Sequence, residues 1–300
     1  MTETEIVKQI RGLAEGGYRA KAVVRSIGDD CAVVRPKPGE DFVFTTDLVL
    51  QDRHFTLDTH KPADVGHKAL ARSLSDLAAM GSEPVFCLVS LAIPEALSGQ
   101  WTTRFYEGLL ALANRYRITL AGGDLSRFDK VIVDVMCCGR VPKGQALLRS
   151  GATPGEGIYV TGELGGSALG LSTKRGEAWQ HHLRPEPRIE AGLALRKLGV
   201  SAAMDLSDGL SLDLHRLCLE SGVGAELFRD LPLAKSATED QALNGGEDYE
   251  LVFTASAKKK IPARLAGVAV TRIGLVTDGI PGEITRNGQP LRPAGFDHFR

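Results

Sequence analysis

The sequence has no long apolar run and almost no net charge. None of its hydrophobic stretches reaches the roughly 18–20 residues that a bilayer-spanning helix needs, and the first residues, Met-Thr-Glu-Thr-Glu-Ile, lack the basic start and apolar core of a signal peptide. The formal net charge of −1 gives no electrostatic reason to expect a nucleic acid or a membrane surface as a partner. We therefore expect a cytoplasmic protein that binds neither.

The sequence has few cysteines, and their spacing indicates no functional site. The five of them are odd in number, form no Cys-x-x-Cys pair and lie within apolar runs. This pattern is typical of reduced core thiols and excludes both a disulfide framework and a zinc site. The five are Cys31, Cys87, Cys137, Cys138 and Cys218.

Familiar nucleotide and nucleophile motifs are also missing. The chain has no Gly-x-x-x-x-Gly-Lys-Ser/Thr loop, no His-Arg-Asp or Asp-Phe-Gly set and no Gly-x-Ser-x-Gly elbow, and no Gly-x-Gly-x-x-Gly lies between a strand and a helix. If this protein binds a nucleotide, it must therefore do so with metal-bound carboxylates in place of a phosphate loop.

What is present indicates an α/β protein of two domains. With 300 residues, 43% hydrophobic and 24% charged, the chain can form one large or two medium domains. Apolar spacing predicts helices over 5–25, 66–80, 101–116 and after 209, and strands over 30–34, 42–47, 85–93, 118–121, 131–138, 158–161, 249–253 and 268–275. We expect the domains to be 1–141 and 142–300, divided near Pro142-Lys-Gly144.

The acidic residues do not resemble solvated surface charge. They lie in glycine-rich or apolar surroundings with few lysines or arginines beside them, and a buried carboxylate is costly unless it is paired, hydrogen-bonded or bound to a cation. Such a set predicts several hard metal ions and a polyphosphate. The set consists of Asp29, Asp30, Asp47, Asp76, Asp124, Asp205, Asp208, Glu247, Asp248 and Glu250.

Simpler interpretations of single residues stay open. Asp29 and Asp30 suit a turn before a strand, and Asp76 could pair with Arg72 one helical turn earlier. Gly122-Gly-Asp124 suits a plain turn after a strand. The run Asp205-Leu-Ser-Asp208-Gly before a helix offers free N–H donors for a phosphate, or only an N-cap at Ser207 or Asp208. Arg149 suits a phosphate clamp or a surface charge.

The order of these segments resembles the thiamine-monophosphate kinase family, within the superfamily of aminoimidazole ribonucleotide synthetase. The matching segments cover nearly the whole chain: Gly28-Asp-Asp, Thr45-Thr-Asp47, His54-Phe55, Lys68-Ala-Leu-Ala, Leu74-Ser-Asp-Leu-Ala-Ala-Met-Gly81, Gly122-Gly-Asp124, Met204-Asp-Leu-Ser-Asp-Gly-Leu210, Gly245-Gly-Glu-Asp-Tyr-Glu-Leu251 and Gly295-Phe-Asp-His-Phe299. One stretch departs from the family, which has Val-Glu-Gly before its x-His-Phe where this chain reads Val49-Leu-Gln-Asp-Arg53-His-Phe55.

The resemblance implies a fold, partners and a set of site residues. It implies a mixed N-terminal sheet whose helices and strands form a homodimer, an α/β C-terminal domain, and ATP in a cleft between the domains. Several magnesium ions would be bound by Asp30, Thr45, Thr46, Asp47, Asp76, Asp124, Asp205 and Asp208, of which Asp76, Asp47 and Asp208 would be catalytic. ATP would contact Tyr106, Gly123, Asp124, Arg149 and Ser207, and thiamine monophosphate would contact His54, Glu247, Asp248 and Phe296.

The implied reaction is direct in-line transfer of the γ-phosphoryl group of ATP to thiamine monophosphate, the last step of thiamine diphosphate biosynthesis. The acceptor is already an anionic phosphate, so no strong base is needed and catalysis reduces to positioning and charge neutralisation. Two alternatives stay open: another ATP-dependent enzyme of the same superfamily, and a non-catalytic regulator that binds a nucleotide or a metal.

Overall fold

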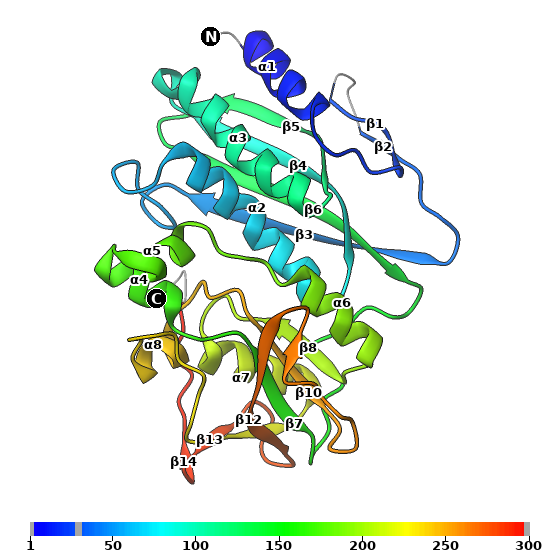
Figure 1. The fold of residues 1–300 in the computed structure, drawn as a ribbon, viewed down its shortest axis with the longest axis vertical. Helices are drawn as coiled ribbons and strands as arrows, with labels where there is room; N and C mark the ends of the chain where they lie inside the picture. Colours follow the sequence, from blue (N-terminus) through cyan, green and yellow to red (C-terminus); the bar gives the residue numbers. More distant parts are fainter. Residues whose placement is uncertain (1–2, 28–31, 297–300) are drawn as a thin grey trace. The chain divides into compact units, whose positions relative to one another are not determined.

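The structure, a computed structural model, describes residues 3–27 and 32–296 and divides the chain into two compact units (Figure 1). The first unit comprises residues 1–77 and 82–144, and the second comprises 78–81 and 145–300. Among the described helices, none is long and apolar enough to cross a membrane.

A four-stranded mixed sheet forms the centre of the first unit. Its strand order is β3 (Glu40–Leu50), β6 (Ile132–Pro142), β4 (Glu83–Ile93) and β5 (Thr119–Arg127). The β3–β6 and β6–β4 pairs are antiparallel, whereas β4 and β5 are parallel. The remaining elements are α1 (Glu3–Glu15), α2 (Pro62–Ala79), α3 (Gln100–Arg115), the 3₁₀ turn η1 (Glu95–Leu97) and a small sheet of β1 (Val23–Arg25) and β2 (Val33–Val34).

Alternation along β3 gives the sheet two different faces. Val49 is fully buried, whereas Phe44 and Leu48 are 63% and 52% exposed on the other face. The buried face is covered by α2, whose Ser73 hydroxyl donates to the Val135 carbonyl of β6 (2.8 Å). Helix α2 crosses α3 closely, because a Cβ on Gly66 would lie 2.0 Å from the carbonyl oxygen of Phe105.

Two sequence-based expectations for the first unit are wrong. The helix predicted over 5–25 ends at Glu15, since Gly16 and Gly17 follow and residues 23–25 form β1. Gly122-Gly123-Asp124 does not form a turn but continues strand β5 past a register shift. A Cβ on Gly123 would lie 1.9 Å from the Val89 carbonyl oxygen, so only glycine allows the two strands to approach there.

The second unit has a larger, mainly antiparallel sheet. Its strand order is β14 (Gln289–Pro290), β13 (Ile284–Arg286), β9 (Gly224–Leu227), β12 (Val268–Thr277), β7 (Gly157–Thr161), β10 (Leu251–Ala255) and β8 (Ala202–Asp205), with β11 (Arg264–Leu265) beside β12. Only β13 and β9 pair in parallel. Its helices are α4 (Gly166–Thr173), α5 (Gly176–Leu183), α6 (Ile189–Leu198), α7 (Leu210–Ser221) and α8 (Glu239–Asn244).

One apolar core holds the second unit together. Ile158 on β7, Val252 on β10 and Leu214 on α7 are fully buried in it. The apolar stripe predicted after Asp208-Gly209 is the face of α7 that packs here. The position of that helix fixes the loop between β8 and α7, which carries several of the predicted site residues.

Candidate active-site residues in each unit

Strand β3 and helix α2 bring three predicted magnesium ligands together in the first unit. The Thr45 hydroxyl donates to the Asp76 carboxylate, and the Arg72 guanidinium lies 3.8 Å from Asp47. Burial, Cys87 and both carboxylates raise the pKa of the Cys137 thiol well above its usual value, which places Asp47 and Asp76 around one point of the sheet. Arg72, considered above as a partner of Asp76, thus lies within ion-pair distance of Asp47.

The Thr46 hydroxyl does not join this group. Successive strand residues point to opposite faces, so Thr46 projects away from Thr45 and Asp47 and donates to Asp134 on β6 (2.5 Å). The sequence-based prediction placed Thr45 and Thr46 in one set of ligands, but only the Thr45 side chain lies beside Asp76.

The donor chemistry of this group suits magnesium, although the full predicted cluster is not assembled. Within residues 3–27 and 32–296, no group of three or more His, Cys, Asp or Glu side chains could hold a metal ion by itself. Asp47, Asp76 and the Thr45 hydroxyl are all oxygen donors, and magnesium commonly takes one or two carboxylates and completes its shell with water and phosphate oxygens. Asp30 lies outside the described residues.

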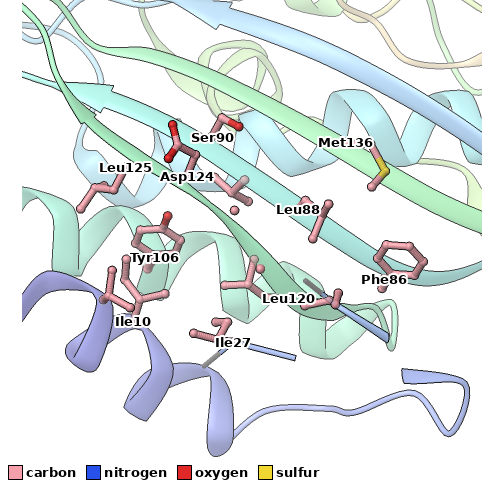
Figure 2. Close-up of a pocket in the computed structure, with 16 residues that line it drawn as sticks. Ile10, Ile27, Phe86, Leu88, Ser90, Tyr106, Leu120, Asp124, Leu125 and Met136 are labelled. Atoms are coloured by element: carbon pink, nitrogen blue, oxygen red, sulfur yellow. The ribbon is translucent and has the colours of Figure 1, made fainter. Parts of the chain in front are cut away.

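A cavity of about 870 Å³ lies in the first unit (Figure 2) and brings predicted ATP contacts together. Its lining includes Tyr106 from α3 and Gly123 and Asp124 from β5, together with apolar side chains such as Leu88 and Met136. Burial, with a smaller effect of Cys87, raises the pKa of the Tyr106 hydroxyl, which therefore stays protonated. The volume falls in the range of ligand pockets, roughly 300–1,000 Å³, and the mixed lining suits a heteroaromatic base.

His54 follows a tight turn made by the stretch that departs from the family pattern. Asp52 has a left-handed φ of 66° and its N–H donates to the Phe55 carbonyl (2.8 Å). The His54 Nδ1 accepts the N–H of Leu50 (2.9 Å), and the buried Lys68 ammonium donates to the His54 carbonyl (3.2 Å). The imidazole is therefore oriented by its own turn.

In the second unit, side chains of α7 hold the loop between β8 and α7 in place by hydrogen bonds. The buried Asp213 carboxylate accepts the N–H groups of Asp208 (2.9 Å) and Gly209 (3.1 Å). Arg216 donates to both Asp213 (2.9 Å) and Asp208 (2.5 Å). The predicted N-cap at Ser207 or Asp208 is wrong, because the N-cap is Gly209 with a φ of 112° and no side-chain cap.

Sequence reasoning missed Asp213 and Arg216, although a signal was present. An acid in the first turn of a helix, with arginine three residues later, marks a side-chain pair on one face. Asp205 ends β8 and is buried, whereas Asp208 is partly exposed and paired with Arg216. The two predicted magnesium residues of this loop therefore have different environments.

Three separately predicted segments meet at this loop. The Ser207 carbonyl accepts the Glu247 N–H (2.8 Å), and the Asp208 carbonyl accepts the Phe296 N–H (2.9 Å). A Cβ on Gly295 would lie 2.3 Å from the Asp208 carbonyl oxygen, so the C-terminal segment lies directly against the loop. The second unit therefore gathers predicted ATP, magnesium and substrate residues in one place.

Although Asp248 follows Glu247 in the sequence, its side chain is buried. Its carboxylate is 3% exposed and accepts the N–H groups of Gly165 (2.6 Å) and Ser167 (3.0 Å) at the start of α4. Glu250 is likewise internal, paired with Arg188 and accepting the Thr161 hydroxyl (2.6 Å). These two acids brace the fold.

The titration of Asp248 gives a pH-dependent prediction. Burial raises its pKa to about 7 from 3.8, against the opposing effect of the N–H groups of Gly165 and Ser167. The folded state therefore binds the proton more tightly, and its stability falls as pH rises from about 4 to 7. Relative to Asp248→Asn, we expect the wild type to lose about 1.4 kcal/mol per pH unit in this range, measured by urea unfolding.

The control for this experiment is Asp278→Asn, which changes an exposed acid in the turn after β12. It makes the same chemical change at the surface, so its free energy of unfolding relative to the wild type is the reference for the Asp248 effect. A constant difference between Asp248→Asn and the wild type across about pH 4 to 8 would show that Asp248 does not retain its proton.

The two remaining predicted residues are at least partly exposed. Arg149 is exposed, and its carbonyl accepts the Ser221 hydroxyl (2.8 Å). Phe296 is 44% exposed, an aromatic ring on the surface beside the Asp208 loop.

Comparison with known proteins shows which family the chain resembles. Residues 28–141 match the N-terminal domain of the AIR synthase related protein family, and residues 153–285 match its C-terminal domain. Thiamine-monophosphate kinase of Salmonella typhimurium (strain LT2) is 40% identical over 304 residues, covering 92% of each chain. The chain belongs to the thiamine-monophosphate kinase family.

Solved structures of the thiamine-monophosphate kinase family share the whole fold. The enzyme of Stenotrophomonas maltophilia K279a is 34% identical with a TM-score of 0.86, over 97% of this chain and 98% of that one. A structure described as AaThiL complexed with AMPPCP and TMP is 31% identical with a TM-score of 0.79, over 99% of this chain and 97% of that one. The predicted fold class and family are therefore confirmed.

Proposed function

We propose that this chain transfers the γ-phosphoryl group of ATP to the phosphate of thiamine monophosphate, giving thiamine diphosphate and ADP. Membership of the family supports this, as does the relative complexed with AMPPCP and TMP. The observation that carries the proposal is the cavity of about 870 Å³, because it unites Tyr106, Gly123 and Asp124, three positions matched to ATP contacts.

The chain's own residues would position the reactants and hold the ions that neutralise them. Tyr106 and the apolar lining would hold the adenine base, and Ser207 and Arg149 would contact the nucleotide. Asp47, Asp76 and Thr45, with Asp124, Asp205 and Asp208, would hold magnesium. When bound, magnesium supplies the positive charge that neutralises phosphate oxygens during transfer. The acceptor phosphate is anionic at neutral pH, so none of these residues has to act as a strong base.

Thiamine monophosphate would be recognised by His54, Glu247 and Phe296. Phe296 exposes a ring that can stack on an aminopyrimidine or on a cationic thiazolium. Glu247, 19% exposed at its side chain, offers a carboxylate to a cationic or amine-bearing ligand. Asp248 supports Glu247 through the backbone.

Product formation tests the activity. Purified protein incubated with ATP, magnesium and thiamine monophosphate should form thiamine diphosphate and ADP in equal amounts, measured by chromatography. Free thiamine in place of the monophosphate should give no product. ATP binding without any thiamine diphosphate would instead indicate a nucleotide-binding regulator and overturn the proposal.

We also propose that the chain forms a homodimer through the exposed face of the first unit's sheet. Phe44 and Leu48 are apolar and mostly exposed on β3, an unusual exposure for one sheet face in a stable monomer. Leu48→Lys should shift the protein from dimer to monomer in sedimentation velocity. Phe128→Lys, a change at another exposed apolar residue, should leave the dimer intact. A wild-type monomer at high concentration would refute the proposal.

A further inference from the structure

A buried histidine, His182, lies beside Glu247. It sits on α5, is 3% exposed, and its Nδ1 lies 2.9 Å from the Ser167 hydroxyl and 3.5 Å from the Glu247 carboxylate. The ring of Trp179 stacks on it, with centroids 5.2 Å apart and planes 13° apart. Packing and the Ser167 hydroxyl therefore help to fix the position and orientation of the imidazole.

Glu247 itself is held by an unusual backbone. Its φ is 69°, in the left-handed region that residues with side chains seldom adopt, and Tyr249 follows the same pattern with a φ of 52°. Such strain persists where the surroundings impose it and is common at ligand sites. Here the surroundings are the Ser207 carbonyl, which accepts the Glu247 N–H, and the buried Asp248 carboxylate between the two strained residues.

We propose that His182 is a positioning residue that orients the Glu247 carboxylate toward the thiamine part of the substrate; this rests on the proposed function. The backbone fixes where Glu247 starts, but its side chain has several rotatable bonds. A buried imidazole nitrogen 3.5 Å from one carboxylate oxygen favours a single rotamer, which lowers the ordering entropy lost when substrate binds. The other carboxylate oxygen then serves a cationic or amine-bearing heterocycle.

A comparison of Michaelis constants tests the role. His182→Phe keeps a ring to stack on Trp179 but removes the nitrogen beside Glu247, and should raise KM for thiamine monophosphate about ten-fold, the size expected for loss of a polar contact to a charged group. KM for ATP and kcat should change less than about two-fold. His182→Asn restores a donor near the Nδ1 position and should recover part of the loss. Equal rises in both KM values would overturn the proposal.

A double-mutant cycle shows whether His182 acts through Glu247. In a Glu247→Gln background, His182→Phe should add little further increase in KM for thiamine monophosphate, because the interaction it removes is already weakened. Full additivity of the two changes would contradict the proposal. His215→Phe removes a different histidine hydrogen bond in the same unit, to the Gly282 carbonyl (2.7 Å), and should leave KM unchanged.

Trp179 gives a direct binding signal. In a Trp101→Phe background, Trp179 is the remaining tryptophan, so its emission reports on the ring stacked against His182. Titration with thiamine monophosphate should change this emission, with a dissociation constant raised about ten-fold by His182→Phe. If the wild type neither binds nor phosphorylates thiamine monophosphate, the proposed function fails. If the wild type does both and His182→Phe equals it, only the role of His182 fails.

Discussion

Asp76→Asn is expected to lower the rate of phosphoryl transfer by roughly 10²–10³-fold while leaving the fold intact. Asp76 sits on α2 with its carboxylate bound by the Thr45 hydroxyl and close to Asp47. Asparagine keeps the size and one acceptor oxygen for that hydroxyl but removes the charge that magnesium needs.

Two measurements separate this effect from general damage. Steady-state rates at increasing magnesium show whether excess metal restores activity, and melting temperatures with and without magnesium show whether the metal still stabilises the protein. Magnesium should raise the melting temperature of the wild type more than that of Asp76→Asn. Asp129→Asn, at an exposed position between β5 and β6, is the matched control. Activity near that of the wild type in excess magnesium would refute the assignment.

Asp213→Ala is expected to destabilise the protein by about 1–3 kcal/mol, because it leaves two backbone N–H groups at the start of α7 without their buried acceptor. Burial raises the pKa of Asp213 to about 6, against the opposing effects of the Asp208 N–H and of Arg216, so the group is ionised at pH 7. Alanine would leave the N–H groups of Asp208 and Gly209 unsatisfied and Arg216 without its buried partner. Urea unfolding measures the loss.

Removing the second partner checks the cause. Arg216→Met combined with Asp213→Ala should cost less than the sum of the two single changes, because both single changes remove the same ion pair. Glu220→Ala, an exposed acid on the same helix, should change stability by less than about 0.5 kcal/mol. Strict additivity, or a loss for Asp213→Ala as small as that of the control, would show that the loop does not depend on Asp213.

Strong apolar periodicity predicted element type well and predicted element ends less well. The helix expected over 66–80 is the C-terminal part of α2 (Pro62–Ala79), and the strand expected over 85–93 is most of β4 (Glu83–Ile93). The helix expected over 5–25 continued too far, because a basic, moderately apolar segment after Gly16-Gly17 resembles a helix locally. Packing of residues 23 and 34 against the sheet decided that this segment is extended.

The candidate site shows the same division. The sequence by itself determined the family, the two α/β domains and which acids to suspect, because these follow from residue type, order and spacing. Only the tertiary structure decided which of these acids have buried partners within the protein. Strand alternation turned Thr46 away from Asp47, and burial against backbone N–H groups made Asp248 and Asp213 internal braces. The sequence cannot distinguish a carboxylate that faces a ligand from one that accepts a buried N–H. The difference depends on the groups that folding places around it.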